Sequence, residues 1–198
     1  MQKIRTFADH PIQIATKSQI IMCHEHPLSL FRHCPCCGSS HFVINNEKSK
    51  RCENCGFVYY FNPSAATVAV IVNERNELLV CRRGKEPAKG TLDLCGGFSD
   101  CRETSEEGII REVKEETGLD VTETQYLFSQ PNTYLYSGFL VHTVDLFFRC
   151  RVNNLSQAHA MDDAAELYWI PIDELRPELF GLDSIRQGIE KLLREQLL

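Results

Sequence analysis

The chain alternates between apolar, β-branched runs and polar segments in a pattern that predicts a β-sheet. Five runs have the length and composition of strands: residues 66–72, 78–82, 123–128, 139–152 and 165–171. The polar stretch 73–77 predicts a hairpin connection between the first two runs. The run 139–152 alternates and then becomes continuously hydrophobic, which is typical of a strand at the centre of a sheet.

The C-terminal segment 183–198 has the spacing of an amphipathic helix. Its large apolar side chains fall on one side: Ile185, Ile189, Leu192 and Leu193. We expect this helix to close the fold, after a short helical turn at 172–175. Residues 1–30 show no firm pattern and are interpreted as a lead segment. A Cys-His-Glu-His run at 23–26 has no second half and is more often incidental than a metal site.

An acidic cluster lies in the segment GFSDCRETSEEGIIREVKEETGL, residues 97–119. On a helix, Glu112, Glu115 and Glu116 fall within about a third of the circumference. Like charges on one face destabilise a bare helix, so we expect a cation there. Oxygen ligands suit Mg²⁺ or Mn²⁺ better than zinc, and Mg²⁺ commonly completes its shell with phosphate oxygens. The cluster therefore indicates a metal site that handles phosphate.

Two C-x-x-C-G motifs provide a second set of metal ligands: Cys34, Cys37, Cys52 and Cys55. Four thiolates form a closed tetrahedral Zn²⁺ site, which leaves no open position for catalysis. A ribbon of about thirty residues buries little core, so we expect zinc to be structural and to supply folding free energy. Cys36, inside the first motif, is interpreted as a bystander.

Composition limits the other function classes. The formal net charge of −6 gives no basic excess to attract nucleic acid broadly. The cations between the two cysteine motifs leave nucleic-acid contact by the ribbon as a weaker alternative: Lys48, Lys50 and Arg51. No apolar run is long enough to span a bilayer, and residues 1–22 lack the apolar core of a secretory signal. We therefore expect a cytoplasmic protein with no membrane partner.

The polar loop 82–90 carries four cations: Arg82, Arg83, Lys85 and Lys89. Such loops are usually only solvated. In a phosphate-handling enzyme, however, one or more of these cations would neutralise a diphosphate. Both interpretations stay open, and Arg82 and Arg83 are the candidates for substrate binding.

Segment 97–119 reads G-x5-E-x7-R-E-hydrophobic-x-E-E-x-G-hydrophobic and resembles the box of the Nudix family. A solvated acidic face would not require the flanking glycines or an arginine beside the first glutamate. The resemblance implies an α/β/α sandwich with a mixed sheet over residues 63–198, with the box as loop, helix and loop. The zinc ribbon, residues 31–62, precedes this domain, and the lead segment 1–30 precedes the ribbon.

The resemblance also implies roles for individual residues. The metal-ligand positions are Glu112, Glu115 and Glu116, of which Glu115 or Glu116 also activates water. The bracing pair is Arg111 and Glu103, and the turn positions are Gly97 and Gly118. Glu166 resembles a downstream acid that in some members joins the metals or acts as base, and Asp162 and Asp163 compete for this role. Cys95 stands where proline is usual, and we expect a tolerated packing change there.

A zinc ribbon directly ahead of the domain resembles the NADH pyrophosphatase subgroup, which includes members that remove NAD caps from RNA. That subgroup continues Ser-Gln-Pro-Trp-Pro-Phe-Pro-x-Ser after the box. Here Ser129-Gln130-Pro131 and Ser137 are in register, Tyr134 replaces the phenylalanine, and the tryptophan and later prolines are absent. Gln130 and Tyr134 are therefore substrate-binding candidates, together with Gly97 of the box, and ADP-ribose competes with NADH as substrate.

The implied chemistry is hydrolysis of the diphosphate bond of a nucleoside diphosphate derivative, of NADH, NAD or ADP-ribose type. Mg²⁺ or Mn²⁺ would be the catalytic cofactor and Zn²⁺ the structural one. The implied partners are a small nucleotide, NAD-capped RNA in one subgroup, and a second copy of the chain, because family members often form homodimers. The alternative is a non-catalytic module that senses nucleotides or binds nucleic acid. Such a module would not require every carboxylate of the box, yet all are present.

Overall fold

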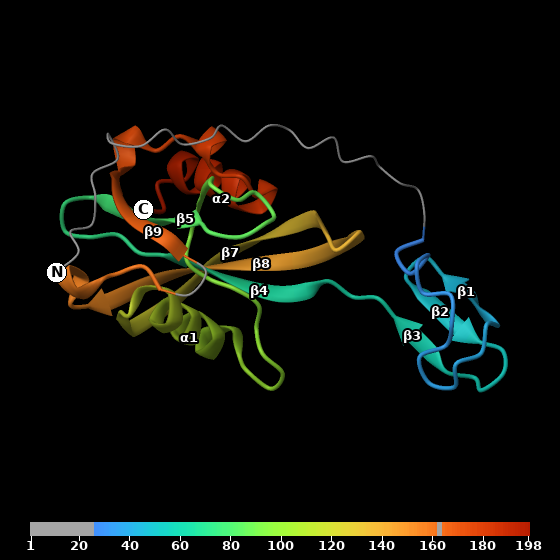
Figure 1. The fold of residues 1–198 in the computed structure, drawn as a ribbon. Coiled ribbons are helices and arrows are strands. Elements are labelled where there is room, and N and C mark those ends of the chain that lie inside the picture. Colours follow the sequence, from blue (N-terminus) through green and yellow to red (C-terminus); the bar gives the residue numbers. More distant parts are fainter. Residues whose placement is uncertain (1–25, 162–163) are drawn as a thin grey trace.

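The computed structural model of this protein describes residues 26–161 and 164–198. The Cys-His-Glu-His run at 23–26 lies outside the described residues except for His26. The competing acids Asp162 and Asp163 also lie outside them. Figure 1 shows a small β-ribbon beside a larger α/β body. None of the described helices combines the length and apolar character needed to cross a bilayer.

The body contains two three-stranded sheets. The first has the order β4 (Ser64–Val70), β8 (Phe139–Asn153), β7 (Asp120–Tyr136), with β4 parallel and β7 antiparallel to β8. The second is antiparallel, in the order β6 (Leu92–Asp93), β5 (Glu77–Arg83), β9 (Ala164–Pro171). The long strand β8 is central in its sheet, which confirms the prediction from its hydrophobic pattern.

The expected single mixed sheet is thus divided in two. The polar stretch 73–77 does form a tight connection, where Asn73 donates its backbone N–H to the carbonyl of Glu77 at 3.0 Å. The chain after β4 pairs with β5 through an isolated bridge between Val72 and Leu78. The two strands then diverge, because each pairs along its length with a different partner.

Helices cover the sheets on both sides (Figure 1). Helix α1 (Ser105–Thr117) buries Ile109 and Val113 in one core, which also contains Cys95. Helix α2 (Asp183–Arg194) buries its apolar stripe in a second core: Ile185, Ile189 and Leu192. This arrangement confirms the α/β/α sandwich. Cys95 is 1% exposed and occupies a packing position, in agreement with its interpretation from the sequence.

Two element ends differ from the predictions by more than three residues. Strand β7 extends to Tyr136, since its polar second half pairs with β8 in antiparallel register as far as Phe139. Helix α2 ends at Arg194, four residues before the chain end. The predicted helical turn is present as the 3₁₀ helix η3 (Ile172–Glu174), and two further 3₁₀ turns complete the body: η2 (Leu155–Gln157) and η4 (Pro177–Leu179).

The ribbon is an antiparallel sheet in the order β1 (Phe42–Asn46), β2 (Ser49–Cys52), β3 (Val58–Tyr60). Phe61, just after β3, packs edge-on against Phe139 at the start of β8, with ring centroids 5.4 Å apart. Phe31 contacts the same ring at 5.7 Å. Aromatic side chains on both sides of the ribbon strands therefore pack the ribbon against the body.

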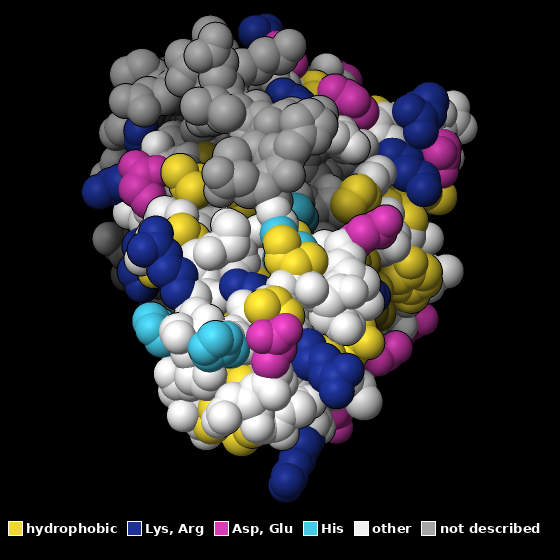
Figure 2. All heavy atoms as spheres, turned by 90° about the vertical axis from the view of Figure 1, so that its right-hand side faces the viewer, with side chains coloured by type: hydrophobic (Ala, Val, Ile, Leu, Met, Phe, Trp, Pro, Cys, Tyr) yellow, Lys and Arg dark blue, Asp and Glu magenta, His cyan; other side chains and the backbone are white. Residues whose placement is uncertain are grey.

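On the face that Figure 2 shows, the cations form no single basic patch among the described residues. Figure 2 shows Lys and Arg side chains scattered among hydrophobic and polar ones on the described part of this face. Lys50 is buried, donates from Nζ to the carbonyl of Phe31 at 2.6 Å and lies 5.2 Å from the Phe42 ring. One of the three cations that suggested nucleic-acid contact thus has a structural role.

Candidate active site and metal centres

The four predicted zinc ligands converge on one point in the ribbon. The Sγ atoms of Cys34, Cys37, Cys52 and Cys55 all lie within 4.8 Å of one another. The pair Cys34 and Cys55 is separated by 3.7 Å, and the pair Cys37 and Cys52 by 3.6 Å. A tetrahedron with Zn–S bonds of about 2.3 Å separates its sulfurs by about 3.8 Å. The four side chains therefore fit a closed zinc site.

The surroundings of these sulfurs shift the thiol pKa values in opposite directions, and the neighbouring thiols, Cys37 first, raise the pKa of Cys55 to about 12. A hydrogen bond from the backbone of Ser39 is the largest influence that lowers the pKa of Cys37, to about 6. The thiolate is the form that binds metal. Apart from the cysteines, the ribbon core contains only Phe42 and the partly buried Phe57 among the described residues. Cys36 is exposed and outside the cluster, in agreement with its interpretation as a bystander.

The acidic segment folds as loop, helix and loop. The hydroxyl of Thr104 accepts the backbone N–H of Glu107 at 3.1 Å, and the Glu107 carboxylate accepts the backbone N–H of Thr104 at 2.9 Å. This capping box starts α1. The helix ends at Gly118, whose φ of 73° is in the left-handed region that favours glycine. The three glutamates of interest consequently lie on the last two turns of α1.

Arg111 donates hydrogen bonds to three acidic side chains of this segment. Its Nε and Nη2 donate to the two carboxylate oxygens of Glu103 at 2.8 and 2.9 Å. These hydrogen bonds lower the pKa of Glu103 to about 2. Nη1 donates to Glu112 at 2.8 Å and to Glu115 at 3.0 Å. The expected bracing pair is therefore present, and the same guanidinium also engages two of the three predicted metal ligands.

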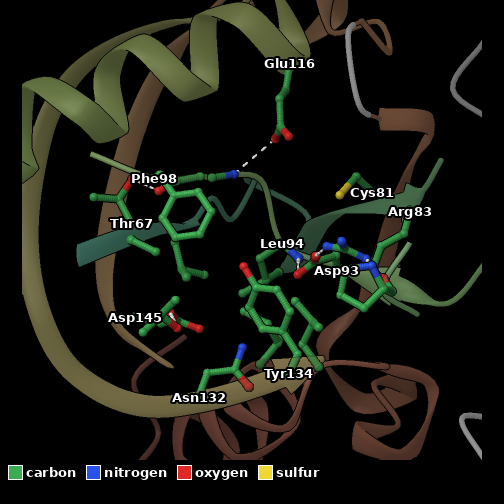
Figure 3. Close-up of a pocket in the computed structure, with 18 of the residues that line it drawn as sticks. Thr67, Cys81, Arg83, Asp93, Leu94, Phe98, Glu116, Asn132, Tyr134 and Asp145 are labelled. Atoms are coloured by element: carbon green, nitrogen blue, oxygen red, sulfur yellow. Dashed lines mark hydrogen bonds and ion pairs between the residues drawn. The ribbon is translucent and has the colours of Figure 1, made fainter. Parts of the chain in front are cut away.

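Glu116 lies apart from this network, on the wall of a cavity of about 210 Å³ (Figure 3). Its side chain extends from α1, and its Oε2 accepts the backbone N–H of Gly96 at 3.0 Å. Glu116 is 8% exposed. Burial raises its pKa to about 8, and the charges of Asp93 and Glu112 act in the same direction. The site thus contains a buried carboxyl group that is destabilised when ionised.

The fit of a divalent ion depends on Glu112 and Glu116. Within the described parts of the chain, only the four cysteines place three or more potential ligand atoms within 4.8 Å of one another. The three glutamates therefore do not converge as one cluster: two pair with Arg111, and Glu116 faces the cavity. A cation would offset the acidic surroundings of Glu116. The Glu112 carboxylate lies directly against the backbone of Gly97. A Cβ atom added to this glycine would be only 2.6 Å from Glu112 Oε1. This donor set fits Mg²⁺ or Mn²⁺ completed by phosphate oxygens, once Glu112 leaves Arg111.

Glu116 also predicts a dependence of stability on pH. In EDTA, the unfolded chain ionises this carboxyl group near its ordinary pKa of about 4.3, whereas the folded chain retains the proton up to about pH 8. Stability should therefore fall as the pH rises from about 5 to 8, by up to about 1.4 kcal/mol per pH unit from this group. Glu116→Gln removes the titration, so the variant should melt at a higher temperature than the parent at pH 8.

Thermal melts of both proteins in EDTA between pH 5 and 8 measure this difference. The gap should close towards pH 5 and should narrow at pH 8 when Mg²⁺ stabilises the parent alone. A gap that is independent of pH would show that Glu116 does not titrate in this range.

Glu166 and Arg82 lie away from the cavity. Arg82 Nη1 is 3.5 Å from Glu166 Oε2, and the hydroxyl of Tyr168 donates to the same carboxylate. Tyr168 packs in the core beneath α2, on the face of the sheet opposite α1. The structure therefore does not bring Glu166 to the box glutamates, and Arg82 pairs with Glu166 across β5 and β9. Adjacent strand residues alternate between faces, which separates Arg82 from its neighbour Arg83.

The remaining predicted binding residues are mostly at the cavity. Arg83, Gly97 and Tyr134 line it, whereas Gln130 lies on β7 outside the lining. Arg83 forms an ion pair with Asp93 and donates from Nε to the carbonyl of Pro87 at 2.7 Å. These contacts fix the guanidinium on the cavity wall.

Sequence reasoning missed the two aspartates and the asparagine of this cavity: Asp93, Asn132 and Asp145. All three are buried, and burial raises the pKa of Asp93 against the opposing effect of Arg83. Asp145 is the lone acid in the apolar run 139–152. Burying a polar residue costs free energy unless it is hydrogen-bonded. An acid inside a hydrophobic strand, such as Asp145, was therefore the signal in the sequence that could have identified a site residue.

Comparison with known proteins matches most of the chain to one domain family. The family model described as the NUDIX domain matches residues 62–194. The "NAD-capped RNA hydrolase NudC" of Vibrio atlanticus is 29% identical over 61% of this chain and 44% of its own length. The "ADP-ribose pyrophosphatase" of Methanocaldococcus jannaschii is 33% identical over 64% of this chain and 72% of its own length. The chain spans about half the length of the NudC relatives it matches, 44% and 55% for two of them.

Solved structures show the same fold. A NUDIX hydrolase from Nitrosomonas europaea superposes with a TM-score of 0.65, covers 84% of this chain and 92% of its own, and is 20% identical. The NUDIX domain of Shewanella oneidensis NrtR, solved with ADP ribose, has a TM-score of 0.54 at 20% identity and covers 70% of this chain and 91% of its own. At these identities the likeness concerns the fold alone.

Proposed function

Since this chain belongs to the Nudix family, we propose that it is a pyrophosphohydrolase dependent on Mg²⁺ or Mn²⁺. Its substrate is a nucleoside diphosphate derivative of NAD(H) or ADP-ribose type. The observation that carries the proposal is Glu116, a buried carboxyl group of the box helix on the wall of a cavity. The same cavity presents the cations Arg83 and Lys85. An acidic metal-binding wall beside a basic wall suits a diphosphate.

Different residues of the chain would bind the metal ion, accept the proton of the water and bind the phosphate. A divalent ion, when bound, neutralises phosphate oxygens and lowers the pKa of the attacking water. Glu112 and Glu116 would hold the ion, and Glu115 or Glu116 would take the proton of the water. Arg83, fixed by its ion pair with Asp93, would bind phosphate oxygens as a directed donor.

The names of the relatives support the substrate class. They include an ADP-ribose pyrophosphatase and NAD-capped RNA hydrolases. The ring of Tyr134 provides an aromatic surface in the cavity for a base or a nicotinamide. We propose that the group beyond the diphosphate is a small nucleotide half or the 5′ end of an RNA, and that zinc in the ribbon is structural.

A second candidate is a module that binds nucleotides without cleaving them. The hydrogen bonds from Arg111 to Glu112 and Glu115 favour it, because a guanidinium already supplies the positive charge that these glutamates require. In this case Arg111 would keep its partners when a nucleotide binds.

A substrate panel separates the two candidates. The panel contains NADH, NAD⁺, ADP-ribose, diadenosine polyphosphates, nucleoside triphosphates and NAD-capped RNA, each with and without Mg²⁺. We expect Mg²⁺-dependent release of AMP from NAD(H) or ADP-ribose, or of NMN from capped RNA, and no release in EDTA. Tight binding of one member without any hydrolysis across the panel would support the binding module instead.

A further inference from the structure

One side of the cavity carries a pair of polar side chains that the proposed reaction does not use. Asn132 on β7 and Asp145 on β8 line the cavity together with the ring of Tyr134. Figure 3 shows these three residues across the cavity from Glu116. They are therefore placed to contact the part of a substrate that extends away from the metal-binding wall.

The amide of Asn132 is held with its donor end towards the cavity. Its Oδ1 accepts the backbone N–H of Thr133 at 3.0 Å. Because the oxygen takes this donor, the other end of the amide is the NH₂ group. Figure 3 shows the nitrogen of Asn132 pointing into the cavity. Asn132 is 6% exposed, so this donor is shielded from bulk solvent.

Asp145 presents a fixed acceptor beside this donor. The hydroxyl of Thr143 donates to Oδ1 at 2.5 Å, and the hydroxyl of Ser184 donates to Oδ2. Each carboxylate oxygen still has a second lone pair. Asp145 is 5% exposed. Two hydroxyl partners from different elements leave its carboxylate little freedom to turn away from the cavity.

The strand register places the donor and the acceptor on one face. Asn132 is opposite Thr143 in the antiparallel pair of β7 and β8, and Asp145 is two residues further along β8. Diagonal neighbours of this kind have Cα atoms about 7–8 Å apart. One small group of a ligand can therefore accept a hydrogen bond from Asn132 and donate one to Asp145. A volume of about 150 Å³ accommodates a benzene ring, so the cavity, at about 210 Å³, encloses only part of a nucleotide and the rest of the substrate extends out of it.

We propose that Asn132 and Asp145 read the edge of a planar ring that presents a hydrogen-bond acceptor beside an amino group, with Tyr134 as the wall. This inference rests on the proposed function and deepens it by assigning the residues that determine specificity. The carboxamide of nicotinamide and the N1 and amino edge of adenine share this chemistry. An analogue with an oxygen in place of the amino group leaves Asp145 without its donor, and a carboxylate in that place is also repelled by it.

The test compares matched substrate pairs that differ in the amino group. One arm compares NAD⁺ with nicotinic acid adenine dinucleotide, and the other compares ADP-ribose with its hypoxanthine analogue. The parent should prefer the amino member by at least about 10-fold in kcat/KM in one arm, since a site built to bond a substrate N–H rejects the analogue that lacks it. Asp145→Asn should lower this preference by at least about 10-fold, because its amide donates to the analogue.

Asp173→Asn is the matched control, since Asp173 is exposed on η3, and it should keep the parental preference. If Asp145→Asn does not melt cooperatively, Asn132→Ser carries the test and should lower the same preference. A lowered preference for NAD⁺ over nicotinic acid adenine dinucleotide assigns nicotinamide to this side of the cavity. A lowered preference for ADP-ribose over its hypoxanthine analogue assigns adenine to it. Parental preferences in both arms for both variants would overturn the inference and leave the proposed hydrolysis intact.

If the parent hydrolyses no member of either pair, the proposed function fails separately. The dissociation constants of the same four nucleotides, measured by calorimetry for the parent and Asp145→Asn, then test the inference. Equal discrimination by both proteins would overturn it.

Discussion

Glu116→Gln is expected to lower kcat for hydrolysis of the best panel substrate by about 10²- to 10⁴-fold at saturating Mg²⁺, the range typical of a lost acid–base group. Glutamine still accepts the N–H of Gly96, so the loop and helix should keep their geometry. The variant lacks the negative charge that would hold a divalent ion or accept the proton of the attacking water. The loss should therefore appear in kcat while the fold remains intact.

Glu115→Gln is expected to lower the rate by orders of magnitude as well, if this carboxylate activates the water. Glu106→Gln is the matched control, since Glu106 is exposed on the first turn of the same helix. Steady-state kinetics across a Mg²⁺ titration compare the three variants. Parental rates for both Glu115→Gln and Glu116→Gln would mean that the box does not catalyse the reaction.

Cys52→Ala is expected to reduce bound zinc from one ion per chain to none and to unfold the ribbon. Cys52 is fully buried, and its sulfur completes the group of four. Three thiolates leave the tetrahedral site open, and the small remaining core does not supply the free energy that metal binding contributes. Hydrogen exchange should rise throughout residues 31–62 while the cores around α1 and α2 remain protected.

Cys36→Ala is the control, because Cys36 is exposed and outside the cluster. This variant should keep one zinc and the parental exchange pattern. Metal analysis and hydrogen exchange on both variants measure the difference. Zinc retained by Cys52→Ala, or lost from Cys36→Ala, would contradict the assignment of the ligands.

Elements with strong local signals could be predicted from the sequence. The spacing of the two cysteine motifs was sufficient to predict the sulfur cluster, because each short motif constrains its own geometry. The box helix was predicted for a similar reason: the acids, Arg111 and Gly118 all act within a few turns of one helix. The apolar stripe around Ile189 likewise identified α2.

Features that depend on strand register could not be predicted. Arg82 and Arg83 are neighbours in the sequence, yet Arg82 pairs with Glu166 whereas Arg83 lines the cavity. The register of β5 with β9 shifts between these two residues. Asn132 and Asp145 meet only through the pairing of β7 with β8, which no local pattern specifies. Glu166 matched a position in a motif, but its place on β9 turns it towards Tyr168 and away from the box.

The partition of the box glutamates also arises from three-dimensional contacts. Helical spacing placed Glu112, Glu115 and Glu116 on one face, and this spacing is observed. It could not show that Arg111 reaches both Glu112 and Glu115 while the loop at Gly96 engages Glu116. The proposed enzyme must therefore exchange a guanidinium for a metal ion at Glu112 when substrate binds.

The most direct test of this exchange is a crystal structure of the protein with Mn²⁺ and an ADP-ribose analogue whose bridging oxygen is a methylene group. We expect anomalous peaks for Mn²⁺ at roughly 2.0–2.3 Å from carboxylate oxygens of Glu112 and Glu116, distances typical of hard divalent ions. Arg111 should then retain Glu103 and release Glu112. An analogue bound in the cavity with no Mn²⁺ at α1, and with both hydrogen bonds from Arg111 to Glu112 and Glu115 intact, would contradict the account.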